Sequence, residues 1–341
     1  MIKFIKKNPA IPQRWIVLTA LAYSLTAAQA QTPQAEKAFI KENMEFATKQ
    51  YSLMMQTPAQ GKNGKAIMPH SIRKDGTPSK GSIYLWTAGF FPGTLWYLSN
   101  YTGDKALQDS ALVYTHQMEP AKTFTDNHDI GFMMYCSYGN ANRFAPKDEY
   151  EDILVESARS LCTRFRPQAK VIQSWNGFRS WHGDKVYDFP VIIDNMMNLE
   201  LLFHASKVTG DESFRKVAIS HAEQVMHHQV RKDYSCFHII YYDKKTGKPI
   251  KGETSQGYSD NSAWSRGQAW GIYGFTMCYR ETRDKRFLKT AEKMADFYLD
   301  HPNLPSDKVA WWDFNAFQEG YTPGIRSNAC KMVNNYRDAS A

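Results

Sequence analysis

Cysteine is scarce and scattered in this chain of 341 residues, which argues against two kinds of small scaffold. The five cysteines are Cys136, Cys162, Cys236, Cys278 and Cys330, and no two of them have Cys-x-x-Cys spacing. Neither a disulfide framework nor a zinc ribbon is indicated, although a single disulfide stays open. The His-Glu-x-x-His motif of many metallohydrolases is also missing, and we expect no catalytic metal and no cofactor.

A strong charge of one sign is lacking as well. The formal net charge is +8, but residues 1–30 contain four basic residues and no acidic one. The remaining chain has 38 basic and 34 acidic residues, a net charge of +4. The basic residues are dispersed, whereas nucleic-acid binding needs a clustered basic face, so we expect no nucleic-acid partner.

Long hydrophobic runs are missing except for one short run near the N-terminus. Basic residues precede apolar residues 15–25, and Ala28-Gln29-Ala30 stands before Gln31. This order is typical of a cleavable secretory signal, which predicts cleavage after Ala30 and a periplasmic or secreted protein. The run is too short for an ordinary membrane span, so we expect no membrane contact after cleavage. No linker-like tract divides residues 31–341, and we predict one catalytic domain there.

The rest of the chain repeats a pattern in which a helix rich in aromatic residues, a polar turn and an amphipathic helix follow one another. The turns lie at 101–105, 144–148, 208–212 and 281–285. Glycine or arginine at the helix end and aspartate at the next N-cap are the expected signals. Inner helices near 84–102, 128–144, 190–208 and 262–281 would alternate with outer ones, after a first helix near 33–56. We predict about nine helices in an all-α, double-layered α/α toroid.

Residues 261–275 place large aromatic and polar side chains among small ones. Trp264, Gln268 and Gly271 recur on one stripe of a helix, and Arg266 and Trp270 lie on the adjoining stripe. Aromatic faces pack against sugar rings, and a guanidinium binds a carboxylate through paired hydrogen bonds. The pattern indicates a site for an acidic sugar. The alternative is a buried helix whose glycines permit close packing.

Two aspartates stand at or near the starts of predicted inner helices. Asp129 follows His128, and Asp194 follows the apolar residues 189–193. A carboxyl group among apolar neighbours has a raised pKa and can hold a proton to donate. The alternative for each is helix N-capping, which is common at such positions.

Several segments together resemble unsaturated glucuronyl hydrolases, glycoside hydrolase family 88. They are Trp86-Thr87-Ala88-Gly89-Phe90-Phe91-Pro92-Gly93, His128-Asp129-Ile130-Gly131-Phe132, Asp194-Asn195-Met196-Met197-Asn198-Leu199, Gln256-Gly257-Tyr258-Ser259-Asp260, Trp264-Ser265-Arg266-Gly267-Gln268-Ala269-Trp270-Gly271 and Trp312-Asp313-Phe314. The resemblance covers nearly all of residues 31–341 and implies an (α/α)6 barrel.

The resemblance also implies roles for individual residues. Asp194 matches the general acid/base, and Asp129 matches a residue that assists it and contacts the sugar. The positions that match substrate-binding residues are Trp86, Asn127, His128, His238, Gln256, Arg266 and Trp270.

The implied substrate is an oligosaccharide with a 4,5-unsaturated uronate at its non-reducing end. Asp194 would protonate C4, and water activated by the resulting carboxylate would add at C5. The hemiketal so formed would open and expel the remaining sugar. Because cleavage follows hydration of a double bond, the carboxylate-spacing rule for ordinary glycosidases does not apply.

Three alternatives remain open. An unsaturated rhamnogalacturonyl hydrolase would use the same barrel and chemistry on pectin fragments. A sugar isomerase or epimerase would need paired histidines across the cavity as proton carriers, and the sequence argues against it because only His128 and His238 are candidates for that place. A non-catalytic glycan-binding protein would use the aromatic pocket without turnover, and the presence of both aspartates argues against it.

The chain ends at Arg337-Asp338-Ala339-Ser340-Ala341, where the family pattern begins a further inner helix. We therefore expect about three of twelve helices to be missing, and exposed apolar faces to make residues 31–341 poorly stable and weakly active. Thermal unfolding and turnover, measured beside a version with the missing helices, check this expectation. A cooperative transition with full turnover from residues 31–341 would contradict it.

Overall fold

The computed structural model describes residues 33–56, 65, 67–73, 75–183 and 185–316. The chain divides into two compact units, Met1–Tyr51 and Ser52–Ala341, and each is described by itself. The predicted signal segment, Cys330 and the C-terminal Arg337–Ala341 lie outside the described residues. Export, a single domain over 31–341 and a truncated barrel therefore stay predictions.

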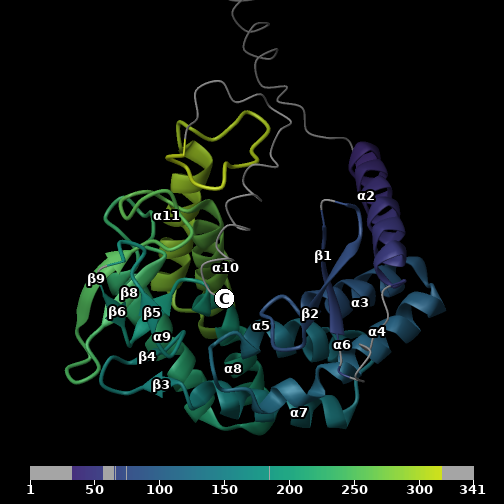
Figure 1. Cartoon of the computed structure of the whole chain (residues 1–341), viewed down its shortest axis with the longest axis horizontal. Helices are drawn as coiled ribbons and strands as arrows, with labels where there is room; N and C mark the ends of the chain where they lie inside the picture. Colours follow the sequence, from purple (N-terminus) through teal and green to yellow (C-terminus); the bar gives the residue numbers. More distant parts are fainter. Residues whose placement is uncertain (1–32, 57–64, 66, 74, 184, 317–341) are drawn as a thin grey trace, which may run out of the picture. The chain divides into compact units, whose positions relative to one another are not determined.

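Helices dominate the described residues (Figure 1). The first unit contains most of α2 (Pro33–Met54). The inner helices of the second unit are α3 (Phe90–Thr102), the continuous run of α5 (Ile130–Met134), η2 (Tyr135–Gly139) and α6 (Asn140–Phe144), α8 (Asn195–Thr209) and α10 (Ser265–Thr282). The outer helices are α4 (Lys105–Gln117), α7 (Asp148–Cys162), α9 (Glu212–His228) and α11 (Lys285–Asp300), and a 3-10 turn, η1, spans Glu119–Thr123.

Helix contacts follow the predicted inner and outer order. The inner helices contact one another in series, α3 with η2, α5 with α8, and α8 with α10. The outer partners pack on them, α4 on α3, α7 on α5, α9 on α8, and α11 on α10. If the run from α5 to α6 counts as one helix, the described residues contain the nine helices that we predicted. This arrangement is the α/α repeat expected from the sequence.

Three of the four predicted turns have the expected geometry. Gly103, Gly210 and Arg283 end their helices in the left-handed conformation. After them, the side chains of Asp104, Asp211 and Asp284 each accept a hydrogen bond from a first-turn backbone N–H. The turn at 144–148 is different, and our N-cap prediction for Asp148 was wrong. Pro146 excludes a helical cap at Ala145, Lys147 occupies the N-cap position, and Asp148 is already helical.

Short strands are the main departure from the all-helical expectation. Antiparallel pairs join β1 (Ile67–Ile72) to β2 (Pro78–Ser82), β3 (Phe165–Arg166) to β4 (Val171–Ile172), and β5 (Phe178–Arg179) to β6 (Val186–Tyr187). A three-stranded sheet contains β7 (Pro190–Ile192), β8 (Ile239–Tyr242) and β9 (Pro249–Glu253). The segment from 190, which we predicted to be helical, therefore begins as a strand. Its residues Pro190–Ile192 are all buried, and Val191 and Ile192 are β-branched residues that favour strands.

Glycines bring the inner helices close together. A Cβ built at Gly131 would lie 2.4 Å from Asn198 Oδ1 on α8, and one at Gly274 would lie 2.4 Å from Met196 Cβ. On the outer layer, α11 buries only Phe287, Thr290, Ala291 and Met294, which lie at helical spacing on one face. The inner layer is thus packed on several sides and the outer layer on one.

None of the helices in the described ranges combines the length and the apolar character that crossing a membrane requires.

The cap assignments predict a difference between two aspartates. Asp104→Ala removes the side-chain acceptor of the Ala106 N–H and should lower the free energy of unfolding by about 1 kcal/mol. Asp148→Ala removes no cap and serves as the matched control, with a smaller loss. Urea unfolding of both variants measures the difference. Equal losses would contradict the assignment of Asp148 to the first turn rather than to the cap.

Candidate active site

Aromatic rings from three inner helices form one continuous row. Trp86, in the segment that leads into α3, contacts Phe90 and Phe132 at centroid distances of 5.9 and 5.6 Å. Phe132 on α5 in turn contacts Trp270 on α10 at 5.6 Å. Trp86 and Trp270 are only partly buried, so they have faces that a ligand can reach. The row suits the apolar face of a sugar ring.

Arg266 extends this row with a positive charge. Its guanidinium lies 4.5 Å from the ring centre of Trp264 and 5.7 Å from that of Trp86. One terminal nitrogen donates a hydrogen bond to the side-chain oxygen of Gln256, while its Nε has no hydrogen-bond partner among the described residues. Burial lowers the pKa of Arg266, and the charge of Asp194 opposes that shift. A partly buried guanidinium with an unpaired donor is suited to bind a carboxylate.

Asp129 and Asp194 occupy the N-cap positions of α5 and α8, yet neither side chain caps its helix in the part of the chain that is described. The N-capping alternative is therefore wrong for both. Burial raises the pKa of Asp194 to about 6, against Arg266 and the nearby Trp270 indole, which favour the charged form. Burial and the neighbouring Asp194 charge raise the pKa of Asp129 to about 7, with Arg164 acting against them. Two close carboxyl groups that do not readily ionise together share a proton.

His238 stands next to Asp194 because β7 and β8 are paired. Ile193 donates its backbone N–H to the His238 carbonyl at 3.0 Å. His238 Nδ1 accepts from the backbone N–H groups of Ser255 and Gln256 at 3.1 and 3.3 Å, so the proton of the neutral ring lies on Nε2. That nitrogen is 3.8 Å from Asp194 Oδ2. Burial lowers the pKa of His238 to about 3, so the ring is neutral.

Buried polar atoms without hydrogen-bond partners gather at this place. Among the described side chains they include His128 Nε2, Asp194 Oδ2, His238 Nε2, Arg266 Nε and Trp270 Nε1. Leaving such groups unpaired costs free energy, and a ligand can supply their partners. Four of these five atoms are nitrogen donors and one is a carboxylate oxygen, which indicates a site for a polar, negatively charged ligand.

Some residues singled out in the sequence make structural contacts within the protein. Gln268 donates to the Tyr234 and Met294 carbonyls and is fully buried, so it holds packed segments together. Tyr273, farther along α10, donates its hydroxyl hydrogen to Glu200 on α8. Asn127 accepts from the Asp129 backbone N–H at 2.8 Å, which shapes the turn before α5; this bond gives Asn127 a structural role and does not test its predicted contact with substrate. Gly267 and Gly271 face Trp264, Ile193 and Met294, so the close-packing alternative holds for that side of α10.

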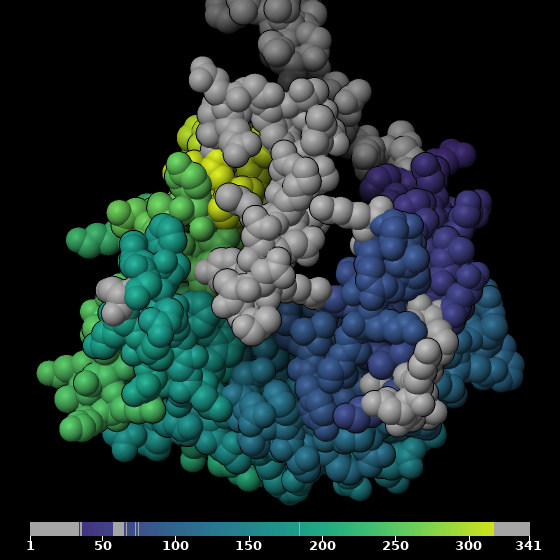
Figure 2. Space-filling view, viewed as in Figure 1, coloured from purple at the N-terminus to yellow at the C-terminus, as the bar shows by residue number. Residues whose placement is uncertain are grey.

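Two aspartates hold the loop that carries Gln256 in place through hydrogen bonds. Neither of them was given a role from the sequence. Asp260 accepts from the Thr254 backbone N–H, the Trp181 indole and His182. Asp313 accepts from the Tyr258 backbone N–H and the Ser262 hydroxyl. The motifs that contain these aspartates were visible, but their partners lie far away in the sequence. In Figure 2 the teal atoms near residue 180 and the green atoms near residue 250 lie side by side.

His182, Asp260 and Glu253 bring potential metal ligands within 4.8 Å of one another. The Lys251 ammonium lies 3.1 Å from Glu253 Oε1, and the Ser180 hydroxyl donates to the same oxygen. The positive charge of Lys251 already compensates the negative charge of the buried Glu253. We therefore interpret the three residues as a structural link between the β5–β6 hairpin and the 254–262 loop rather than as a metal site.

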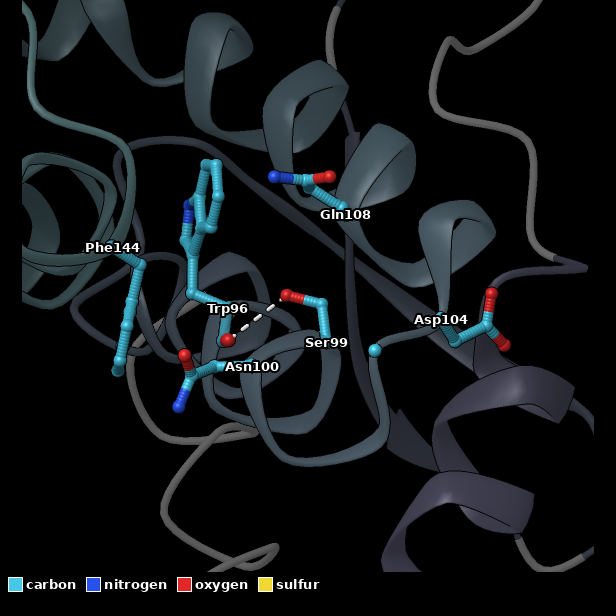
Figure 3. A pocket seen from close by; sticks show the side chains of 7 residues that line it. Trp96, Ser99, Asn100, Asp104, Gln108 and Phe144 are labelled. Atoms are coloured by element: carbon cyan, nitrogen blue, oxygen red, sulfur yellow. Dashed lines mark hydrogen bonds between the residues drawn. The ribbon is translucent and has the colours of Figure 1, made fainter.

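A further pocket of about 270 Å³ lies near the C-terminal end of α3, away from Trp86 (Figure 3). Trp96, Asn100 and Phe144 line it, and Ser99 donates its hydroxyl to the Trp96 carbonyl. It brings together no group from the site of Asp129 and Asp194, and we assign it no function.

Comparisons with known proteins identify the family. The sequence profile of Glycosyl Hydrolase Family 88 matches residues 60–278. The chain belongs to glycosyl hydrolase family 88. An unsaturated glucuronyl hydrolase of Formosa agariphila is 45% identical over 251 residues, which are 73% of this chain and 60% of that protein. An unsaturated chondroitin disaccharide hydrolase of Streptococcus pyogenes is 35% identical over 306 residues, 86% of this chain and 71% of that protein.

Solved structures support the same family and its fold. A crystal structure of an unsaturated glucuronyl hydrolase specific for heparin superposes with a TM-score of 0.75 at 41% identity, covering 82% of this chain and 72% of that one. The Bacillus sp. GL1 enzyme gives 0.67 at 34% identity, with 74% and 67% covered. The predicted (α/α)6 barrel fold is confirmed. This family 88 chain spans 60% of the length of the Formosa relative.

The raised carboxyl pKa values predict how stability depends on pH. Unfolded aspartate titrates near 3.9, so between about pH 4 and pH 7 the folded protein keeps protons that the unfolded chain releases. Stability should therefore fall as pH rises through this window. Asp194→Asn removes one such group and should raise the free energy of unfolding at pH 8 by about 1–3 kcal/mol, with little change at pH 4.

Urea unfolding at both pH values measures this effect. Asp243→Asn is the control, because hydrogen bonds from Thr246 lower the pKa of that exposed carboxyl, and its loss should not raise stability at pH 8. An Asp194→Asn variant with the pH dependence of the original chain would show that Asp194 is not desolvated.

Proposed function

We propose that this protein is a glycoside hydrolase that removes a 4,5-unsaturated uronic acid from the non-reducing end of oligosaccharides. The observation that carries the proposal is the pair of desolvated carboxyl groups, Asp129 and Asp194, beside an aromatic row and a partly buried arginine. A proton donor, a sugar platform and a carboxylate-binding group are the parts this reaction needs.

Asp194 is the proposed acid and base. A pKa of about 6 lets the carboxyl hold a proton near neutral pH and release it to C4 of the substrate. The carboxylate left behind can then accept a proton from the water that adds at C5. Its Oδ2 makes no hydrogen bond in the described structure, so it is free to contact substrate and water. Asp129 assists from the neighbouring helix.

The remaining groups bind the uronate. Trp86 and Trp270 offer ring faces, and Arg266 with Gln256 and His238 offers donors for the carboxylate and hydroxyl groups. A cation close to C5 would oppose the positive charge that develops there, so we assign Arg266 to binding rather than to the chemical step.

The relatives favour glycosaminoglycan fragments as substrates. Two of them are named for unsaturated glucuronyl and unsaturated chondroitin disaccharide hydrolysis. A mutant of the Streptococcus agalactiae enzyme, 30% identical to this chain, was solved with dGlcA-GalNAc6S. Unsaturated rhamnogalacturonyl hydrolysis remains the second candidate, because the same acid and the same platform serve either leaving sugar.

We also propose that the protein acts in the periplasm or outside the cell. Support comes from the basic, then apolar, then Ala-Gln-Ala order of residues 1–30. Lyases that make unsaturated uronates would then supply the substrate, and no nucleic acid or membrane is required.

Asp194→Asn tests the reaction. Loss of the ultraviolet absorbance of the conjugated enol ether in unsaturated chondroitin, heparin and pectin disaccharides measures turnover. The variant should lose turnover by at least about 10³-fold, because an amide can neither donate the proton nor accept one from water, while the Kd for the substrate should change by less than about threefold. Asp243→Asn is a matched surface control.

An original chain that binds the disaccharides without consuming them would favour the glycan-binding alternative. Turnover that survives in Asp194→Asn would instead assign the acid role to another group.

A further inference from the structure

One buried serine is bonded to the segments that lead into both aspartates of the carboxyl pair. Ser174 follows β4 and is fully buried. Its backbone carbonyl accepts a hydrogen bond from the N–H of His128, the residue before Asp129, at 3.0 Å. Its hydroxyl oxygen accepts from the N–H of Ile192, two residues before Asp194, at 2.9 Å. A single residue therefore joins the chain before one aspartate to the chain before the other.

The bonds of Ser174 to β7 complete one edge of that strand. On the opposite edge β7 pairs with β8, and the Ile193 N–H donates to the His238 carbonyl. Successive residues of a strand direct their N–H and C=O groups to alternate edges, so Pro190 and Ile192 face away from β8. The Ser174 N–H donates to the Pro190 carbonyl at 2.9 Å, and its hydroxyl accepts from Ile192. Ser174 thus occupies the place of a further strand.

A buried arginine bonds the residues near Ser174. Arg164 Nε donates to the Gln173 carbonyl at 2.8 Å, and the Gln173 N–H donates back to the Arg164 carbonyl at 3.0 Å. The guanidinium also donates to the Thr125 carbonyl, in the loop before α5, and to Asn176 Oδ1. Because breaking such buried bonds leaves donors and acceptors unpaired, Ser174 has little freedom to move.

The first residue of α8 is bonded to the same segment. Asn195 Nδ2 donates to the Ile172 carbonyl at 2.8 Å. The carbonyls of residues 172, 173 and 174 thus accept in turn from α8, from Arg164 and from the chain before α5. The starts of α5 and α8 are held on one short piece of backbone.

We propose that Ser174 is a positioning residue, which sets the separation of the two carboxyl groups of Asp129 and Asp194. It acts through the segments that carry them and not on the sugar. The proposal rests on the function proposed above, in which both carboxyl groups act on one sugar ring.

The separation of the carboxyl groups matters for two reasons. An acid must lie within hydrogen-bonding reach of the atom that it protonates, and a misplacement of about 1 Å can cost about 10²-fold in rate. The electrostatic interaction of two carboxylates also depends on their distance. Because Asp129 and Asp194 belong to different helices, their distance depends on how the two helix starts are joined.

Ser174→Ala in the full chain removes the hydroxyl and leaves the Ile192 N–H without this acceptor. We expect kcat to fall by at least about tenfold with KM within about threefold, because Trp86 and Arg266 bind the sugar from other segments. Crystal structures of the original chain and of the variant measure the separation of the two carboxyl groups. It should change by more than about 0.5 Å.

Thr115→Val is the matched control. Thr115 is fully buried between α3 and α4, and its hydroxyl accepts from the Trp96 indole at 3.0 Å. Its loss leaves a buried N–H unpaired, as Ser174→Ala does, but in a place that holds neither aspartate. Both variants should unfold at a lower urea concentration than the original chain, whereas Thr115→Val should keep kcat within about threefold.

A second pair of variants separates the hydroxyl from the effect of side-chain size. Ser174→Thr and Ser174→Val give side chains of the same shape, and only the first keeps the hydroxyl acceptor. The threonine variant should have a kcat at least about tenfold above that of the valine variant. Hydrogen exchange on the original chain needs no substitution. The amides of His128 and Ile192 should be among the slowest to exchange, and exchange as fast as that of exposed amides overturns the proposal.

Ser174→Ala with an unchanged kcat, or with the carboxyl groups at their original separation, overturns the proposal. An equal fall in kcat in Thr115→Val does the same, because general destabilisation would then explain the loss. Absence of turnover in the original chain, together with a changed separation in Ser174→Ala, supports the positioning role and counts against the proposed function alone.

Discussion

The site depends on two carboxyl groups that are held close together in a space with little water. Asp129 and Asp194 come from different inner helices, and each raises the cost of ionising the other. A helix N-terminus ordinarily stabilises a carboxylate, but neither side chain turns back to cap its own helix in the described structure. The helix starts therefore aim these groups into the site, and desolvation rather than the helix dipole sets their proton affinity.

The short strand β7 makes this placement of Asp194 at a helix start possible. A helix that began at residue 190 would bury Asp194 in its second turn, whereas β7 ends at Ile192 and leaves Asp194 at the start of α8. Pairing of β7 with β8 then brings the His238 carbonyl to the Ile193 N–H, and the loop after β9 supplies the N–H groups that orient the His238 ring. The small sheet and the loop after it thus fix the position and orientation of His238 beside Asp194.

Much of the fold could be predicted because its signals are local. Asp104, Asp211 and Asp284 cap helices next to left-handed residues, and the outer helices have a clear apolar stripe. β7 was not predictable, since its partner strand β8 lies about fifty residues away in the sequence, and β3 to β6 have only two residues each, too few to show an alternating pattern. The turn at 144–148 failed for a local reason, because Pro146 changes the conformation of the residue before it.

For the candidate site too, the sequence indicated individual residues but not the contacts that distant segments make with them. The sequence indicated Trp86, Asp129, Asp194, Arg266 and Trp270, and the structure places them around one space, as the ring contacts and the electrostatic neighbours show. The sequence could not show that the two sides of α10 have different roles. One side, with Gly267, Gly271 and Gly274, packs tightly on Ile193, Met294 and Met196, and the other presents Arg266 and Trp270 to the carboxyl pair.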